Sequence, residues 1–363
     1  MRGIQRKSQL LQMMYTCRDL YEAGVPLLLA LPIRIKHPQL RSFCRYIMAD
    51  TARCRHFRNL ALFAQRFSSN GTTKMSMQRE ALLQLARHAL NLEKLEIKGR
   101  FLRLDPRYVE AYGSFKNLRH LRIWGYSPKL IARFLSSLKC SLRAVYVHYS
   151  DTSGRFSSVL ASCDEDLETL HIFNCTLPNM LEPVAMFPNL TKLRLENITS
   201  GNGPFLMKSF PNLRHLSCVN CTDLSGNVSS NFVFSELAKI RRASIEEQLR
   251  SKCGWRSLSS VAGPVLWLYG LGIMCPVGKL SLKFQHWIQP DMHNACHPDV
   301  VEYARPKRMS ISFSLYECEK YIHGVLGTMP PTVQKFELEV EGRKGSELEN
   351  MLVSIHSIDR FLC

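Results

Sequence analysis

The sequence predicts an α/β fold, a leucine-rich-repeat solenoid of horseshoe shape with a helical N-terminal cap. Three observations lead to this prediction: a short apolar motif that recurs at a near-constant spacing, helical patterns between its copies, and a helical segment ahead of the first copy. The 363 residues exceed what one ordinary core needs. A hydrophobic fraction of 45% and a charged fraction of 21% are typical of a folded chain rather than a disordered one.

The recurring motif is L-x-x-L-x-L, in which other apolar residues also fill the three fixed positions. Successive copies start 26, 24, 25, 23 and 23 residues apart, a period typical of leucine-rich repeats. A single short strand cannot bury its apolar side alone, whereas stacked copies share a continuous core. The six clear copies start at Leu92, Leu118, Leu142, Leu167, Leu190 and Leu213, and more divergent copies start at Phe57, Val277, Pro306 and Val333.

The same repeat explains a C-x-x-C pair, Cys218 and Cys221, that is otherwise typical of zinc or redox sites. The full template continues x-x-N/C-x-L after its third apolar position. Cys218 fills an apolar position and Cys221 fills the N/C position, so we interpret both thiols as structural. A zinc site would need a second C-x-x-C pair, and the sequence contains none.

Helical patterns separate the repeated strands. In "SPKLIARFLSSL", Ser127 is a natural N-cap and Pro128 suits the first helical position. The repeats break between about 225 and 276, where a loop and a polar, charged helix predict an insertion that projects from the repeat domain. We therefore expect a capping segment over residues 1–52 and a leucine-rich-repeat domain over residues 53–363, with that insertion near 225–276.

The N-terminal segment combines two amphipathic helices, "SQLLQMMYTCRDLY" and "PQLRSFCRYIMAD", with an apolar stretch, "VPLLLALPIRI", that we expect to be a strand. Because the ends of a solenoid expose apolar surface, this segment can cap the first repeat. Its apolar helical positions would then pack inward.

This region also resembles a known family. The phrase "LLQMMYTCRDLYEAGVPLLLALPIRI" with "LRSFCRYIMADTARCRHFRNLAL", and later "GWRSLSSVAGPVLWLYGLGI", is similar to fungal F-box leucine-rich-repeat proteins. In that family an F-box opens with a Leu-Pro-containing helix upstream, so residues 1–52 correspond to the closing, partial F-box. The resemblance implies a substrate adaptor of a cullin-type ubiquitin ligase that docks a Skp-type adaptor. It implies docking residues at Met13, Met14, Leu20 and Tyr21.

Motifs of common enzymes are absent: the sequence has no G-x-S-x-G, P-loop, G-x-G-x-x-G or H-E-x-x-H. We therefore expect a protein that is not an enzyme and has no cofactor. One cluster, "HWIQPDMHNACHPD" with His286, Asp291, His293, Cys296 and His297, contains metal-ligand side chains. Its spacing matches no zinc pattern, so we interpret it as an exposed loop without metal.

A binding surface follows from the strand geometry. In the repeated strands the motif residues point inward, and the alternate residues face solvent on the concave side. Aromatic and basic side chains together are typical of protein-interface hot spots. The predicted partner-binding residues are Lys94, Lys98, His120, Arg122, Trp124, Tyr146, His148, His171, Phe173, Lys192 and Arg194.

The distribution of charge along the chain is compatible with a second function. Residues 1–125 contain 23 Lys and Arg against 8 Asp and Glu, out of a net charge of +18 for the whole chain. Such a basic region indicates a solvated face or an acidic partner, and the alternative hypothesis is a basic nucleic-acid-binding repeat protein. The basic start has no uninterrupted apolar run, and Val261–Val277 is short and broken by Pro and Gly. We therefore expect a cytoplasmic or nuclear protein without a membrane contact.

Overall fold

A computed structural model shows an α/β chain that divides into two compact units. Unit 1 comprises residues 1–150 and 161–167, and unit 2 comprises residues 151–160 and 168–363. The predicted boundary at residue 52 does not separate these units, because the N-terminal helices belong to unit 1. The structure describes residues 7–36, 39–63, 80, 83–98, 113, 115–150, 154–161, 163, 165–177, 185–199, 203–221, 230–251, 254–284, 290–314, 325, 327, 329–341 and 351–355.

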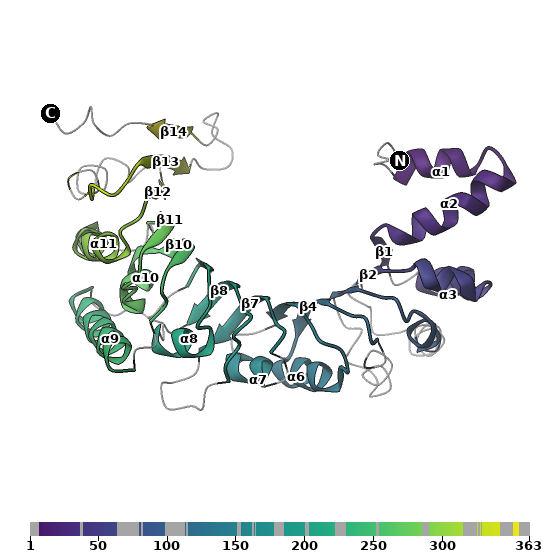
Figure 1. Cartoon of the computed structure of the whole chain (residues 1–363), viewed down its shortest axis with the longest axis horizontal. Helices are drawn as coiled ribbons and strands as arrows, with labels where there is room; N and C mark the ends of the chain where they lie inside the picture. The colour runs from purple at the N-terminus through teal and green to yellow at the C-terminus, as the bar shows by residue number, and fades with distance from the viewer. Residues whose placement is uncertain are drawn as a thin grey trace. The chain divides into compact units, whose positions relative to one another are not determined.

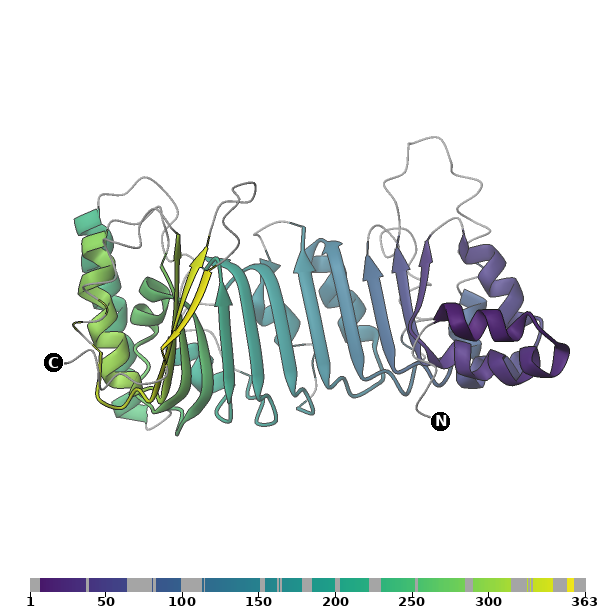
Figure 2. The same ribbon diagram turned by 90° about the horizontal axis from the view of Figure 1, so that it is seen from above.

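Unit 1 is a parallel sheet preceded by helices. The strands β1 to β5 pair in chain order, each parallel to the next, and Figure 2 shows them side by side. The elements are α1 (Lys7–Met14), α2 (Arg18–Ala30), β1 (Ile33–Lys36), α3 (Leu40–Met48), η2 (Thr51–His56), β2 (Asn59–Phe63), β3 (Lys94–Lys98), β4 (His120–Tyr126), α6 (Pro128–Ser137) and β5 (Ala144–Tyr149).

Unit 2 continues the same construction. The strands β7 to β13 pair in chain order and in parallel, β14 adds antiparallel to β13, and the helices α8 to α11 lie on one side of the strands (Figure 1). The elements are β6 (Gly154–Arg155), α7 (Phe156–Leu160), β7 (Thr169–Thr176), β8 (Lys192–Thr199), α8 (Gly203–Ser209), β9 (His215–Val219), α9 (Ser230–Ser251), β10 (Leu258–Pro264), α10 (Val265–Leu271), β11 (Val277–Lys283), α11 (Pro290–Ala304), β12 (Arg308–Ser314), β13 (Lys335–Glu341) and β14 (Met351–Ile355).

The repeat motif sets both the register and the core. Leu95 pairs with Leu121 and Leu121 with Val145, so equivalent motif positions of neighbouring repeats stand side by side. In unit 2 Leu170 pairs with Leu193 in the same way. These side chains are almost completely buried, and their stacking confirms a solenoid-like repeat fold within each unit. The horseshoe shape and the capping role of the N-terminal helices stay predictions.

A left-handed backbone position recurs near the carboxyl end of four strands, β4, β7, β8 and β9. Gly125, Asn174, Asn197 and Asn220 all have positive φ, between 51° and 78°. Each occupies the same place, seven residues after the first motif position of its repeat. Glycine and asparagine tolerate this left-handed backbone better than other residues. The Asn197 side-chain amide also donates to the Asn174 side-chain oxygen at 3.1 Å, which links these equivalent positions of β8 and β7.

The N-terminal segment differs from the prediction in one stretch. We expected a strand over "VPLLLALPIRI", but α2 extends through Ala30 and only Ile33–Lys36 forms a strand. Pro26 lies inside α2 and does not end it. The leucines at 27–29 favour a helix, and one side of α2 packs against α1, where Met14 lies against Gly24. Tertiary packing therefore extended the helix through a run that resembled a buried strand.

The predicted insertion near 225–276 contains a repeat strand that the sequence analysis missed. The strand β10 lies between β9 and β11, parallel to both. Leu258 and Val261 fill the first two motif positions, but Gly263 fills the third. A Cβ on Gly263 would lie 3.0 Å from the Cys218 Cβ, so glycine fits the close approach of β9. Glycine at an apolar position concealed the motif.

The prediction that the charged helix of this insertion projects from the domain is also wrong. Three polar side chains on one face of α9 donate to carbonyls at the end of α10, where a helix leaves its last carbonyls without intrahelical partners. Arg241 donates to the Tyr269 carbonyl at 3.1 Å, Ser244 to that of Leu271 at 2.6 Å, and Gln248 to that of Gly272 at 2.7 Å. This polar face of α9, which resembled a solvated face in the sequence, is therefore buried and caps the end of α10.

The apolar stretch at Val261–Val277 forms β10 and α10, and all seven residues of α10 are buried. Across the parts of the chain that the structure describes, no helix combines the length and apolarity needed to span a bilayer.

We predict that substitutions of adjacent residues in β4 have very different effects on the free energy of unfolding. Leu121→Ala should lower the free energy of unfolding by about 2–5 kcal/mol, because Leu121 is fully buried and truncation leaves a cavity. Arg122→Ala should change it by no more than about 0.5 kcal/mol, because Arg122 is exposed. Urea denaturation of the two variants measures both values, and equal losses would show that the register of β4 is wrong.

Candidate functional site

The predicted concave residues of unit 1 come together in two rows across three neighbouring strands. In one row, Glu96 of β3, Arg122 of β4 and Tyr146 of β5 stand in register. In the other, Lys98, Trp124 and His148 stand in register. Lys94 pairs with His120 at the start of the same strands. All these residues lie on the face opposite the buried motif residues, as the alternation predicts.

Side chains within these rows contact one another. The Lys98 ammonium nitrogen lies 5.4 Å from the centroid of the Trp124 ring, and the Arg122 guanidinium carbon lies 4.5 Å from that of Tyr146. On the next strand, the His148 ring stacks on Trp124 with 5.3 Å between centroids. Cations over aromatic faces stabilise these side chains before any partner binds, which lowers the entropy cost of binding. We call these five residues with Lys94 and His120 the unit 1 patch.

A hollow of about 460 Å³ opens on this face beside the patch. It is lined by residues of β1 to β5, among them Arg34, Ala61, Glu96, Arg122 and Tyr146, which follow one another in a single row. Ala61 has the shortest side chain of the row, a methyl group, and lies between the longer Arg34 and Glu96. This small residue contributes to a recess that has the Arg34 guanidinium on one side and the Glu96 carboxylate on the other, with Arg122 one strand further along.

Sequence analysis missed the members of this hollow that precede Lys94. Arg34 pairs with Ala61 across β1 and β2, and Ala61 pairs with Glu96. The alternation in "RNLALF" already placed Asn59, Ala61 and Phe63 on the outer face. The sequence did not reveal that Arg34 of β1 lines the hollow, because the predicted strand also included residues that belong to the end of α2.

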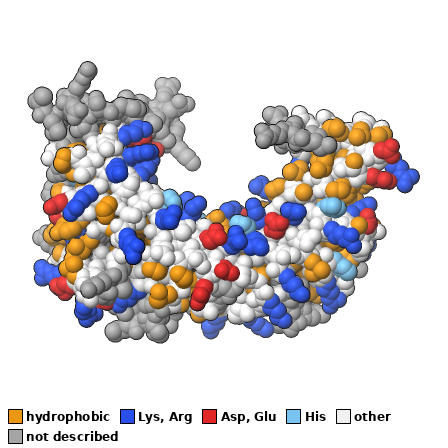
Figure 3. Space-filling model, in the orientation of Figure 1, with side chains coloured by type: hydrophobic (Ala, Val, Ile, Leu, Met, Phe, Trp, Pro, Cys, Tyr) orange, Lys and Arg blue, Asp and Glu red, His pale blue; other side chains and the backbone are white. Residues whose placement is uncertain are grey.

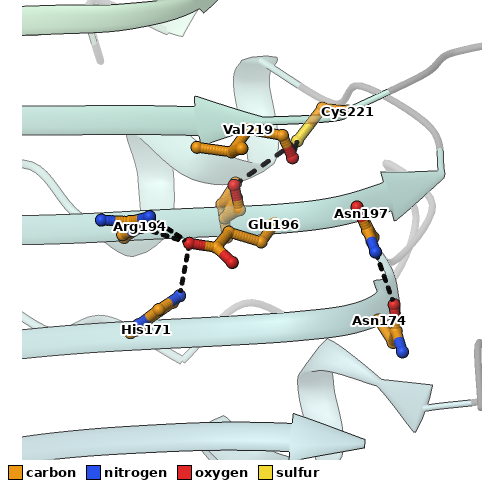
Figure 4. Close-up of polar contacts among 8 residues, drawn as sticks. His171, Asn174, Arg194, Glu196, Asn197, Val219 and Cys221 are labelled. Atoms are coloured by element: carbon orange, nitrogen blue, oxygen red, sulfur yellow. Dashed lines mark hydrogen bonds and ion pairs between the residues drawn. The ribbon is translucent and has the colours of Figure 1, made fainter. Parts of the chain in front are cut away.

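The unit 2 residues of the predicted surface have a different electrostatic environment. His171 of β7 lies 3.2 Å from the Glu196 carboxylate, and Arg194 of β8 also pairs with Glu196 (Figure 4). Glu196 therefore contacts two of the side chains that the sequence suggested as partner contacts. Lys192 stays exposed, and Phe173 is half-buried. That the unit 1 and unit 2 residues form one continuous surface stays a prediction.

The predicted docking residues at the N-terminus are not equivalent. Met13 and Leu20 are 42% and 41% exposed, and Tyr21 is also exposed. Met14 instead is buried, because it fills the space above Gly24 of α2. Figure 3 shows hydrophobic side chains gathered over α1 and α2, and the exposed Leu27 belongs to the same helix pair. Among the described residues of this segment, the exposed large hydrophobic side chains are therefore Met13, Tyr15, Leu20, Tyr21 and Leu27, and Met14 is not one of them.

The two cysteines of the C-x-x-C pair lie in the core of unit 2. Cys218 and Cys221 are 3% and 1% exposed. The Cys221 thiol donates to the Leu195 carbonyl at 3.6 Å, which links it to the neighbouring strand β8 (Figure 4). The buried thiol of Cys175, in the equivalent position of its repeat, has a pKa raised by burial and by its proximity to Cys221. Buried, protonated thiols of this kind are inert, consistent with the structural interpretation.

The histidine-rich cluster forms a helix rather than the exposed loop we expected. His293, Cys296 and His297 lie on α11 and are buried. The Phe284 ring packs on His293 and His297, with 5.0 Å and 6.0 Å between centroids, so apolar packing holds this face against the sheet. His286 lies outside the described residues. Within the described parts of the chain, no group of three or more His, Cys, Asp or Glu side chains is placed to hold a metal ion.

Comparisons with known proteins give no family. No family model matches the sequence, and no curated protein matches it. Among solved structures, a Bacteroides fragilis protein is similar over 83% of this chain and 74% of its own, with 10% identity and a TM-score of 0.35. The yeast Rad7 and Elc1 complex is similar over 85% of this chain and 92% of the matched chain, with 12% identity and a TM-score of 0.34. Likeness at these TM-scores carries no argument about fold or partner.

We predict that His297 makes the protein less stable in acid. Burial, and then the neighbouring His293, lower the pKa of His297 from 6.5 to about 4. Protonation below pH 6.5 therefore favours the unfolded chain. The stability that the neutral side chain contributes is complete above pH 6.5 and is lost as pH falls toward 4. The loss is about 3–4 kcal/mol at most, because each pKa unit corresponds to about 1.4 kcal/mol.

Urea denaturation at a series of pH values measures this loss. In His297→Gln the stability should depend less on pH between 6.5 and 4, whereas the exposed His88→Gln control should follow the wild-type curve. An unchanged slope in His297→Gln would contradict the assignment.

Proposed function

We propose that this protein is a non-catalytic recognition module whose unit 1 patch binds a partner protein. The observation that carries the proposal is the register of Arg122, Trp124 and Tyr146 on neighbouring strands beside the hollow of about 460 Å³. Tryptophan, tyrosine and arginine are the residues that most often dominate protein interfaces. A recess next to such anchors can hold a side chain of the partner.

Two features favour a protein over a nucleic acid at this patch. Trp124 contacts Lys98 on one neighbouring strand and His148 on the other, and Arg122 lies over the Tyr146 ring. Sequence-independent nucleic-acid binding relies on bases that stack on open aromatic faces, and these faces are already in contact. Arg34 and Lys94 form no ion pair with any described residue, so an acidic side chain of the partner can pair with them.

We further propose that the helix pair α1 and α2 docks a Skp-type adaptor, which would make the protein an F-box-like substrate adaptor of a cullin-type ubiquitin ligase. The support is the resemblance of this segment to the closing part of an F-box, together with the exposure of Met13, Leu20 and Leu27. Exposed apolar side chains on adjacent helices are typical of protein docking surfaces. Such an adaptor would act in the cytoplasm or nucleus.

The alternative function is nucleic-acid binding, which the charge of the first 125 residues favours. This hypothesis predicts that affinity for a single-stranded oligonucleotide falls steeply with salt, because cations that contact phosphates release bound counterions. Titration at low and moderate salt measures it. An oligonucleotide that fails to bind even at low salt excludes the alternative.

We predict that Trp124→Ala and Arg122→Ala each weaken partner binding by about thirtyfold or more, because hot-spot truncations cost about 2 kcal/mol. The measurement is quantitative affinity capture from cell extract with wild type and variants, followed by titration of each retained protein. Arg133→Ala, an exposed change on α6, is the matched control and should retain wild-type binding.

Melting curves accompany the capture experiment, so that unfolding is not mistaken for lost binding. Partners retained equally by wild type and Trp124→Ala would refute the unit 1 patch as the binding site.

For adaptor docking, we predict that recombinant Skp-type adaptor co-purifies with the wild-type chain and that Leu20→Asp abolishes this complex. A carboxylate at Leu20 would have to be desolvated in the interface. Leu249→Asp is the control, because Leu249 is an exposed leucine on α9 of unit 2. The absence of a complex with the wild-type chain would remove the ligase-adaptor part of the proposal and leave the unit 1 patch unaffected.

A further inference from the structure

Unit 2 contains a larger depression than the hollow of unit 1, and none of its lining residues was selected as a site residue by sequence analysis. It has a volume of about 1120 Å³ and lies where β8, β9 and β10 begin. Three segments line it: the turn before β8, the end of α8 with the residues that follow it, and the loop that leads into β10. We call it the unit 2 groove.

The walls of this groove are held by hydrogen bonds. The Asn212 side-chain amide donates to the Pro188 carbonyl at 2.9 Å and joins the first two segments. The Trp255 indole N–H donates to the Phe210 carbonyl at 2.8 Å, and Trp255 is buried, so the loop before β10 is anchored next to Arg256. The Arg214 backbone accepts from Ser259 at 2.8 Å. The groove is therefore formed before any partner binds, which reduces the ordering cost of binding.

Positive charge in the groove exceeds negative charge. Arg214 and Arg256 line it, are exposed, and form no ion pair with any described residue. Lys208 also lines it and pairs with Glu247 at 2.6 Å, but Glu247 is shared with Arg250. Lys192 follows directly after the lining residue Thr191, and it too is exposed and has no ion pair among the described residues.

A neighbouring histidine reports the same positive field. His215 follows Arg214 and lies in register with Lys192 of β8. The pKa of His215 is lowered, first by burial and then by the charges of Lys192 and Arg214. A negative group placed between these cations would relieve their mutual repulsion.

The remaining lining residues indicate what kind of anion fits. Met186, which is 61% exposed, lines the groove together with the half-buried Pro188 and Pro211, while the lining residue Met207 is buried. An exposed methionine and prolines beside cations suit a ligand that has both apolar and acidic groups. The groove lining contains no Phe, Tyr or Trp, so it offers no platform on which bases stack. Its volume also exceeds that of most small-molecule pockets.

We propose that the unit 2 groove is a second binding site, which takes an acidic segment of a partner protein with apolar side chains between its carboxylates. Arg214 and Arg256 pair with two carboxylates, and Met186 with Pro188 and Pro211 contacts the apolar side chains between them. This site is in a different unit from the unit 1 patch and does not depend on it.

The test is fluorescence anisotropy with the full chain and a labelled short peptide in which Glu and Leu alternate. The peptide should bind, and its affinity should fall with salt because the contacts are near the surface. The double variant Arg214→Ser, Arg256→Ser should bind about tenfold more weakly, the expectation for two exposed ion pairs. The matched control, Arg133→Ser with Arg242→Ser, removes the same charge elsewhere and should bind like wild type.

Two further ligands test which chemical groups the groove recognises. A peptide with Gln in place of Glu should bind more weakly than the acidic peptide, and equal binding would overturn the role of the arginines. An oligonucleotide of equal charge that binds more tightly than the peptide would overturn the assignment to a protein segment. Failure of the acidic peptide to bind would also overturn this assignment, as would an equal loss of peptide affinity in both double variants. Trp124→Ala should leave this binding intact, which separates the result from the unit 1 patch.

Discussion

Strand register is the constraint on which the rest of this structure depends. Because successive side chains of a strand alternate between faces, a slip of one residue would expose Leu121 and bury Arg122 and Trp124. The in-register stacking of Leu95, Leu121 and Val145 prevents such a slip, since each motif residue is buried against its equivalents. The same register that forms the core therefore places the cations and aromatic rings of the unit 1 patch beside one another.

The repeat also limits where the backbone can turn. Gly125, Asn174, Asn197 and Asn220 share one position in the repeat and a positive φ, so β4, β7, β8 and β9 bend at the same place near their carboxyl ends. Apolar side chains fill the inner positions and Gly or Asn fills the turn, while the outer positions carry no such requirement. Those outer positions are free to differ between repeats. This explains how Glu196 contacts His171 and Arg194 in unit 2, while Arg34 and Lys94 in unit 1 have no ion-pair partner among the described residues.

The sequence predicted most of the repeated strands and the outward direction of the patch residues, because both follow from a period that every copy shares. It missed features that depend on contacts between distant segments. The strand β10 did not match the motif because Gly263 takes an apolar motif position, where the close approach of Cys218 favours a glycine. Arg241 resembled a solvated residue because its acceptor, the Tyr269 carbonyl, lies in another helix. The same limit applies to Ala61, whose role in the hollow is set by its neighbours on β1 and β3.

The irregular part of the repeat array is also where the unit 2 groove forms. The motif copies before β10 are separated by as few as 23 residues, whereas α9 lengthens the connection from β9 to β10. The chain must then return to the sheet through residues 254–257, which Trp255 anchors to Phe210. This return places Arg256 in the same groove as Arg214, which a connection of regular length would not supply. The cap that α9 provides for α10 keeps the inserted helix in place, so one interruption of the repeat both stabilises unit 2 and creates its basic groove.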